Sequence, residues 1–137
     1  MRLADAACSS SLAAARLQEH AAPASRILSE SLATFPVFAA TPSSDPQWSA
    51  IVAWSTYALQ RAEIPATPWT PAGLKSLGID GRDFGLAEDW TKRVVGAAGS
   101  YADMYTRNLG EGSLLKLPRG PNEPAEVGGL VVTPFRE

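Results

Sequence analysis

Residues 85–110, GLAEDWTKRVVGAAGSYADMYTRNLG, decide the fold that we expect from this sequence. Gly96 and Gly99 interrupt a helical pattern, and Ser100 followed by Asp103 is typical of a capping box that restarts a helix. The stretch therefore predicts a helix, a kink and a second helix with one aromatic face. Residues at spacings of three or four place that face, namely Trp90, Val94, Ala97, Tyr101 and Tyr105.

The second helix of this stretch is expected to stop at residues 108–110. Asn108 and Gly110 tolerate the left-handed backbone conformation that commonly ends a helix. Near the start of the stretch, Glu88 and Asp89 lie where the helix dipole favours negative charge. We expect the aromatic face of this unit to pack against one partner surface.

Another strong helix start lies at Asp45, an N-cap candidate followed by Pro46 in the first helical position. Apolar side chains follow helical spacing as far as Ala62, and Pro65 ends the pattern. A second face of the same helix is also aromatic, so we expect both sides to be covered. That second face carries Trp54 and Tyr57.

The chain before this helix has a different composition. Residues 1–34 are rich in Ala and Ser and contain no aromatic residue; within them, 12–20 predicts a short helix and 26–28 a short strand. Residues 34–41, TFPVFAAT, are a better strand candidate. Pro36 has no backbone N–H, which predicts an edge strand or a strand start.

Turn residues dominate two other parts of the sequence. Residues 64–84 form a Pro- and Gly-rich connection that we expect Trp69 to anchor, with a helical turn at 71–77. The last segment, 128–134, predicts a terminal strand or an extended arm.

Length and charge limit the possible functions. The 137 residues are enough for one domain, and the formal net charge of −2 argues against a nucleic-acid binder or a polybasic membrane anchor. No run of apolar residues is long enough for a transmembrane helix. The sequence after Met1 lacks the apolar core of a secretory signal, which predicts a cytoplasmic location for the chain as written.

The residues do not indicate a catalytic set. His20 is the only histidine, so a Ser/His/Asp hydrolase would have to use it, and no nucleophile elbow lies nearby. Cys8, the only cysteine, lacks a paired base and excludes an internal disulfide framework. The acidic residues around Asp80 and Asp83 lack the spacing of a calcium loop. We therefore expect no enzyme, no metal and no cofactor, and from the residues alone a mixed α/β domain.

Several motifs occur in an order that is similar to one known family. The chain resembles the C-terminal part of periplasmic general L-amino-acid-binding proteins, the family-3 solute-binding components of ABC uptake systems. A weaker match lies upstream, in 11–17 and 27–28. The matching motifs from residue 45 onward are Asp45-Pro46-Gln47-Trp48, Val52, Trp54, Tyr57-Ala58-Leu59, Gly85-Leu86, Asp89-Trp90, Arg93-Val94-Val95, Gly99-Ser100-Tyr101, Tyr105, Arg107-Asn108-Leu109-Gly110, Gly112-Ser113, Leu115-Lys116, Arg119-Gly120, Gly128-Gly129-Leu130, Pro134 and Arg136.

This resemblance implies a partial periplasmic-binding-protein type II fold of the α/β class, mostly C-terminal helices with a crossing strand. Residues 1–34 would be the end of lobe 2, 35–44 the crossing strand and hinge, and 45–137 the C-terminal helical part of lobe 1. Such folds close around a ligand by hinge rotation. The resemblance also implies a periplasmic location, an L-amino acid as ligand and ABC permease subunits as partners.

The resemblance further implies an Asp in lobe 2 that pairs with the ammonium group of the ligand. Cys8 stands at the corresponding position, and Asp5 lies three residues earlier. Our candidate ligand-binding residues are Asp5 and Ser10. Because a thiol cannot supply the charge-assisted hydrogen bond that a carboxylate makes, we expect the isolated chain to bind no amino acid.

An alternative reading is an interaction or oligomerisation module that no longer binds a ligand. If no sheet covers the helices, the aromatic faces around Trp48 and Ile51 and around Trp90 and Tyr101 would be exposed. Large exposed apolar patches drive association, which predicts self-association of the chain.

Overall fold

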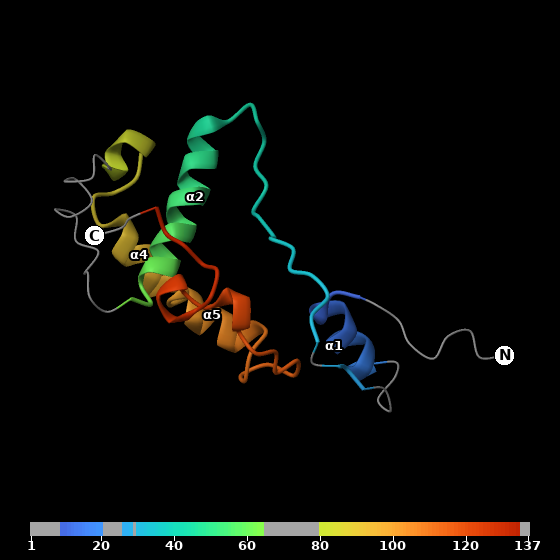
Figure 1. Cartoon of the computed structure of the whole chain (residues 1–137). Helices are drawn as coiled ribbons and strands as arrows, with labels where there is room; N and C mark the ends of the chain where they lie inside the picture. The colour runs from blue at the N-terminus through green and yellow to red at the C-terminus, as the bar shows by residue number, and fades with distance from the viewer. Residues whose placement is uncertain (1–8, 21–25, 29, 65–79, 135–137) are drawn as a thin grey trace.

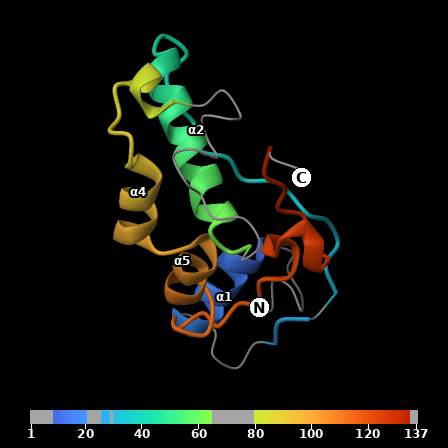
Figure 2. The ribbon, with the colours of Figure 1, turned by 90° about the vertical axis from the view of Figure 1, so that its left-hand side faces the viewer.

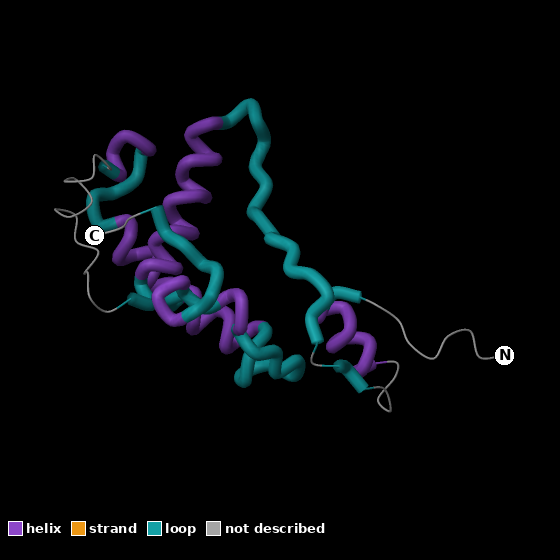
Figure 3. The backbone as a smooth tube through the Cα atoms, viewed as in Figure 1, coloured by secondary structure: helices purple, strands orange, loops and turns teal. Residues whose placement is uncertain are grey.

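The computed structural model describes residues 9–20, 26–28, 30–64 and 80–134. Regular secondary structure in these ranges is helical (Figure 3). The α-helices are α1 (Ser11–His20), α2 (Pro46–Arg61), α4 (Trp90–Ala98) and α5 (Tyr101–Asn108). Three short 3₁₀ helices accompany them, η1 (Gly81–Phe84), η2 (Gly120–Asn122) and η3 (Ala125–Val127).

Most of these elements gather around α2. Helices α4 and α5, η1 and the C-terminal loops lie against it, whereas α1 lies apart at the end of an extended connection (Figure 1). Figure 2 shows α2 and α4 side by side from a second direction. None of the described helices is long and apolar enough to cross a membrane.

Helix α2 begins as the sequence predicts. The Asp45 carboxylate accepts a hydrogen bond from the Trp48 amide at 2.8 Å, and Pro46 occupies the first turn. The helix then runs to Arg61, close to the predicted end. Near its N-terminus the Gln47 side chain donates to the Phe84 carbonyl oxygen at 3.0 Å, which ties α2 to η1.

The hydrophobic core lies between α2 and α4. Ala58 and Trp90 are buried at its centre, and Gly81 of η1 closes over the indole. A Cβ atom at Gly81 would lie 2.8 Å from Trp90 Nε1 and 2.9 Å from the Ala87 carbonyl oxygen, so this position has no room for a side chain. The surrounding apolar side chains are Trp54, Phe84, Leu86 and Val94.

This packing corrects two expectations about the aromatic faces. Trp90 is buried against α2, so the face around it is not open for a partner. Trp48 is half exposed, which means that α2 is not covered on both sides at its N-terminal end. The partner surface of α4 is thus another helix of the same chain.

The predicted kink is confirmed. Helix α4 ends at Ala98, and Gly99 takes a φ of 79°, which favours glycine. The capping box then starts α5, since the Asp103 carboxylate accepts from the Ser100 amide at 2.8 Å and Ser100 Oγ accepts from the Asp103 amide at 3.2 Å.

The end of α5 is confirmed at Asn108, but the left-handed cap is wrong. The C-cap residue is Leu109, with φ −129° and ψ −30°. The amides of Leu109 and Gly110 both donate to the Tyr105 carbonyl oxygen at 2.8 Å, so this turn closes without a left-handed residue.

The expected strands are wrong for the described residues. Residues 35–41, predicted as a crossing strand, form no strand, and neither do 26–28. Of the two alternatives for 128–134, the terminal strand is not formed. The described part holds a single isolated parallel bridge, between Pro124 and Val131. A strand needs a hydrogen-bonded neighbour, and no described segment pairs with the backbone of 35–40. The described residues are therefore helical and do not show the expected α/β class. The turn expected at 71–77 and Trp69 lie outside the described residues.

Candidate functional site

Only one of the two candidate ligand-binding residues lies among those that the structure describes. Asp5 and Cys8 lie outside the described residues, whereas Ser10 caps α1. Ser10 Oγ accepts from the Ala13 amide at 3.2 Å, and the Ser10 carbonyl oxygen accepts from the Ala14 amide at 2.8 Å. Ser10 is exposed, so one lone pair and the hydroxyl proton remain for another partner.

Candidate metal-binding and catalytic groups are not gathered in the part of the chain that the structure covers. There, no group of three or more His, Cys, Asp or Glu side chains is placed to hold a metal ion. His20 is exposed and its Nε2 lies 3.4 Å from Glu19 Oε2. Within the acidic group around Asp80, Asp80 forms an ion pair of 2.7 Å with Arg82, and Asp89 forms one of 2.8 Å with Arg93.

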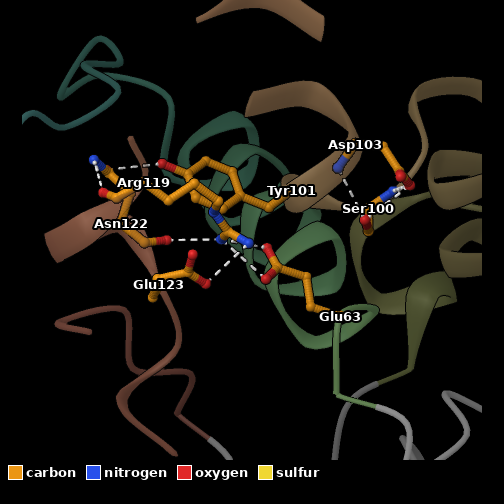
Figure 4. Close-up of polar contacts among 7 residues, drawn as sticks. All are labelled: Glu63, Ser100, Tyr101, Asp103, Arg119, Asn122 and Glu123. Carbon is orange, nitrogen blue, oxygen red and sulfur yellow. Dashed lines mark hydrogen bonds and ion pairs between the residues drawn. The ribbon is translucent and has the colours of Figure 1, made fainter. Parts of the chain in front are cut away.

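Several polar side chains of the described residues meet in the Arg119 cluster, which we define as Arg119, Glu63, Glu123, Asn122, Tyr101 and Tyr105. Arg119 Nη2 lies 2.9 Å from Glu63 Oε2, and Nη1 lies 3.3 Å from Glu123 Oε2. The Arg119 and Glu63 side chains are only 15% and 6% exposed. Figure 4 shows the guanidinium group between these two carboxylates, with Asn122 beside it. The cluster is thus a buried ion pair extended by a second, more exposed carboxylate.

Two tyrosines of α5 complete the cluster. The guanidinium carbon of Arg119 lies 5.6 Å from the Tyr101 ring centroid and 5.9 Å from that of Tyr105, within the range of cation–π attraction. Tyr101 donates to Asn122 Oδ1 at 3.1 Å, and Tyr105 donates to the Pro118 carbonyl oxygen at 2.9 Å. Each phenol therefore joins α5 to the C-terminal loop.

The buried environment shifts the pKa values of both tyrosine hydroxyls. Burial raises the pKa of Tyr101 above its ordinary value, because a phenolate loses hydration inside the protein, although the positive charge of Arg119 acts in the opposite direction. Burial also raises the pKa of Tyr105. Both hydroxyls stay protonated at neutral pH and act as donors, not as bases.

Hydrogen bonds within the C-terminal loop hold Arg119 in this position. The amide and the side-chain nitrogen of Asn122 both donate to the Arg119 carbonyl oxygen, at 2.9 and 3.3 Å, and Arg119 Nη2 returns a bond to the Asn122 carbonyl oxygen at 2.7 Å. The chain then folds back on this turn, and the Val131 amide donates a hydrogen bond to the Glu123 carbonyl oxygen at 3.1 Å. A side chain at Gly129 would overlap the Glu123 carbonyl group, so glycine allows this close return.

Comparison with known proteins gives one consistent result. No protein-family model and no solved structure matches the chain. A general L-amino acid-binding periplasmic protein of Rhizobium johnstonii is 34% identical over 124 residues, and a glutamate/glutamine/aspartate/asparagine-binding protein of Rhodobacter capsulatus is 31% identical over 122 residues. A putative amino-acid ABC transporter-binding protein of Escherichia coli is 29% identical over 122 residues. Each match covers 79% of this chain and 36% of the relative.

The chain is related to part of the periplasmic amino-acid-binding proteins of ABC transporters. The resemblance stated from the sequence motifs is thereby confirmed. The chain spans about a third of the length of these relatives, 36% in each match, so the whole proteins' activities do not transfer to it directly.

Sequence reasoning did not find the Arg119 cluster. Glu63 and Arg119 are 56 positions apart, and neither stands in a chemical motif. The only local signal is the spacing of four between Arg119 and Glu123. The cluster is a structural connection: two carboxylates already neutralise the guanidinium charge, so it is not available to an anionic ligand.

Proposed function

We propose that this chain forms part of the amino-acid-binding component of an ABC uptake system and has no catalytic role. The observation that carries this proposal is the identity of 29–34% to three amino-acid-binding proteins over 79% of the chain. The ligand would be an L-amino acid, the partners would be ABC permease subunits, and the location would be the periplasm.

Within such a component we assign the described helices to the scaffold. The core is made by Ala58 and Trp90, and the polar groups around Arg119 bind one another. We also propose that the chain is part of a type II fold. It would comprise the end of lobe 2 at 1–34, a hinge at 35–44 and a part of lobe 1 at 45–137.

A chimeric protein tests the proposal. The aligned segment of the Rhizobium johnstonii relative is replaced by the matching residues of this chain, and L-amino acid binding is measured by calorimetry. We expect the chimera to fold and to bind if Asp5 takes the place of the carboxylate that Cys8 lacks, and the isolated chain, which spans 36% of the relative, to bind no amino acid. The unmodified relative is the positive control. A chimera that folds without binding, or that does not fold, would contradict the proposed role.

The candidate ligand residues can be tested in the same chimera. We propose that Asp5 contacts the ammonium group of the ligand and that the Ser10 hydroxyl donates to its carboxylate. Asp5→Asn and Ser10→Ala should each weaken binding, whereas Ser9→Ala, at an exposed neighbouring position, should not. Because Ser10 also caps α1, loss of helicity in Ser10→Ala without loss of affinity would assign it a capping role alone.

The alternative function, an interaction module, is weakened at one of its two surfaces. Trp90 is buried in the core, so the face around it cannot serve as an interface without unfolding. The other surface keeps an exposed Trp48, and further exposed apolar side chains lie in the extended segment before α2 and in the C-terminal loops.

A further inference from the structure

The C-terminal segment 118–134, which we call the strap, makes its backbone hydrogen bonds within itself. The Val131 amide donates to the Glu123 carbonyl oxygen at 3.1 Å, and the Leu130 amide donates to the Pro121 carbonyl oxygen at 2.9 Å. In the part of the chain that the structure describes, no backbone hydrogen bond joins the strap to an earlier segment. The strap is therefore a local unit of backbone structure.

The strap buries little apolar area. The hydrophobic core and the side chains packed against it all precede the strap in the sequence. Within the strap, Val127, Leu130 and Val132 are 70%, 66% and 56% exposed, and Thr133 is buried. In Figure 2 the strap, drawn in red, lies to the right of α2, whereas α4 lies to the left. Because apolar burial is the main stabilising term in folding, the strap is held less firmly than the helices.

Polar groups near one end of the strap attach it to the helices. The strap residues that make these contacts lie between positions 118 and 123. The contacts are the Glu63–Arg119 ion pair, the hydrogen bond from Tyr101 to Asn122, the hydrogen bond from Tyr105 to Pro118 and the stacking of Arg119 on the two tyrosine rings. The rest of the strap depends on this attachment for its position.

We propose that the strap is a conformational device that detaches and unfolds as one unit while α2, α4 and α5 stay folded, and that the Arg119 cluster sets how often it opens. The proposal is independent of the proposed function. Segments with few buried apolar contacts open at a lower free energy than the core of a protein. Once the cluster releases, no core supports the internal hydrogen bonds of the strap, so they break together.

The ion pair resists this opening less than its burial suggests. Substituting Glu63 leaves the Arg119 charge inside the protein, whereas opening the strap returns both charges to water. Each charge then recovers the hydration that it lost on burial, so the net contribution of the pair to closure is small. The tyrosine hydrogen bonds remain, and each has a modest net contribution. The strap therefore opens more often than the helices unfold.

Amide hydrogen exchange of the full chain tests the proposal. We expect the amides of Leu130 and Val131 to be at least about tenfold less protected than amides in the middle of α2. Gly81→Ala destabilises the core between α2 and α4, so it should speed exchange in α2 at least about fivefold and leave the strap amides unchanged.

A second pair of variants addresses the attachment. Tyr101→Phe removes the hydroxyl that donates to Asn122 and should speed exchange of the strap amides about fivefold. Tyr57→Phe is the matched control. It makes the same chemical change in α2, where the ring packs against Trp54, and should leave the strap amides unchanged.

The wild-type chain supplies a further measurement. Low concentrations of urea should speed exchange of the strap amides less than that of the α2 amides, because opening the strap exposes less surface. Three results would each overturn the proposal: strap amides as protected as those of α2, a Gly81→Ala variant that speeds both sets alike, or a Tyr101→Phe variant that leaves the strap unchanged.

Discussion

Removing one partner of the Glu63–Arg119 pair should destabilise the chain far more than removing one partner of an exposed ion pair. Glu63→Gln keeps the shape of a side chain that is 6% exposed but removes the charge 2.9 Å from Arg119 Nη2. Breaking a buried pair by removing one partner costs roughly 3–5 kcal/mol, because the other charge stays buried. Arg119 retains Glu123 at 3.3 Å, so we expect the lower end of that range, about 3 kcal/mol.

Urea unfolding followed by tryptophan fluorescence measures this cost, since Trp54 and Trp90 lie in or beside the core. Asp89→Asn is the matched control. It breaks an ion pair of similar length, 2.8 Å between Asp89 and Arg93. The Arg93 side chain is 71% exposed and that of Asp89 is 49% exposed, so this substitution should cost less than about 1 kcal/mol. Equal costs for the two substitutions would refute the argument that burial makes the Arg119 cluster strong.

Two further predictions concern the helical body. Gly81→Ala should destabilise the chain by about 1–3 kcal/mol, because a Cβ there overlaps the Trp90 ring. Gly96→Ala, with nothing within 4 Å, should stabilise α4 by about 0.5–1 kcal/mol. Thermal unfolding measures both, and a Gly81→Ala variant as stable as the wild type would contradict the core contact. Hydrogen bonds from Ser100 lower the pKa of Asp103 below its ordinary value of 3.8, so its contribution is present above that value and is lost as the pH falls through the lowered pKa. The stability difference between the wild type and Asp103→Asn should therefore shrink in acid, and a difference independent of pH would contradict the role of the charge.

Interactions between near neighbours were predictable from the sequence. Asp45 caps α2 through an amide three residues away, and Ser100 with Asp103 caps α5 over the same spacing. Gly99 marks the kink because few other residues adopt its φ of 79°. These groups meet whatever the rest of the chain does, so their pattern alone predicts the result.

The strand prediction failed for the opposite reason. Phe35 to Ala40 have the composition of a strand, but composition does not supply the neighbour that a strand requires. The described helices offer no sheet edge, and the segment stays extended with its apolar side chains in solvent.

The sequence by itself determined where α2 and α5 begin, where the kink falls and to which family of binding proteins the chain is related. Helix α4 begins at Trp90, so Glu88 and Asp89 precede it and do not lie in its first turn as predicted. Only the tertiary structure decided that Trp90 packs on α2 and that Glu63 meets Arg119 across 56 positions. Caps depend on bonds within one helical turn, whereas these contacts depend on the path of the whole chain. A local pattern cannot encode that path, because each partner alone resembles any other surface Trp, Glu or Arg.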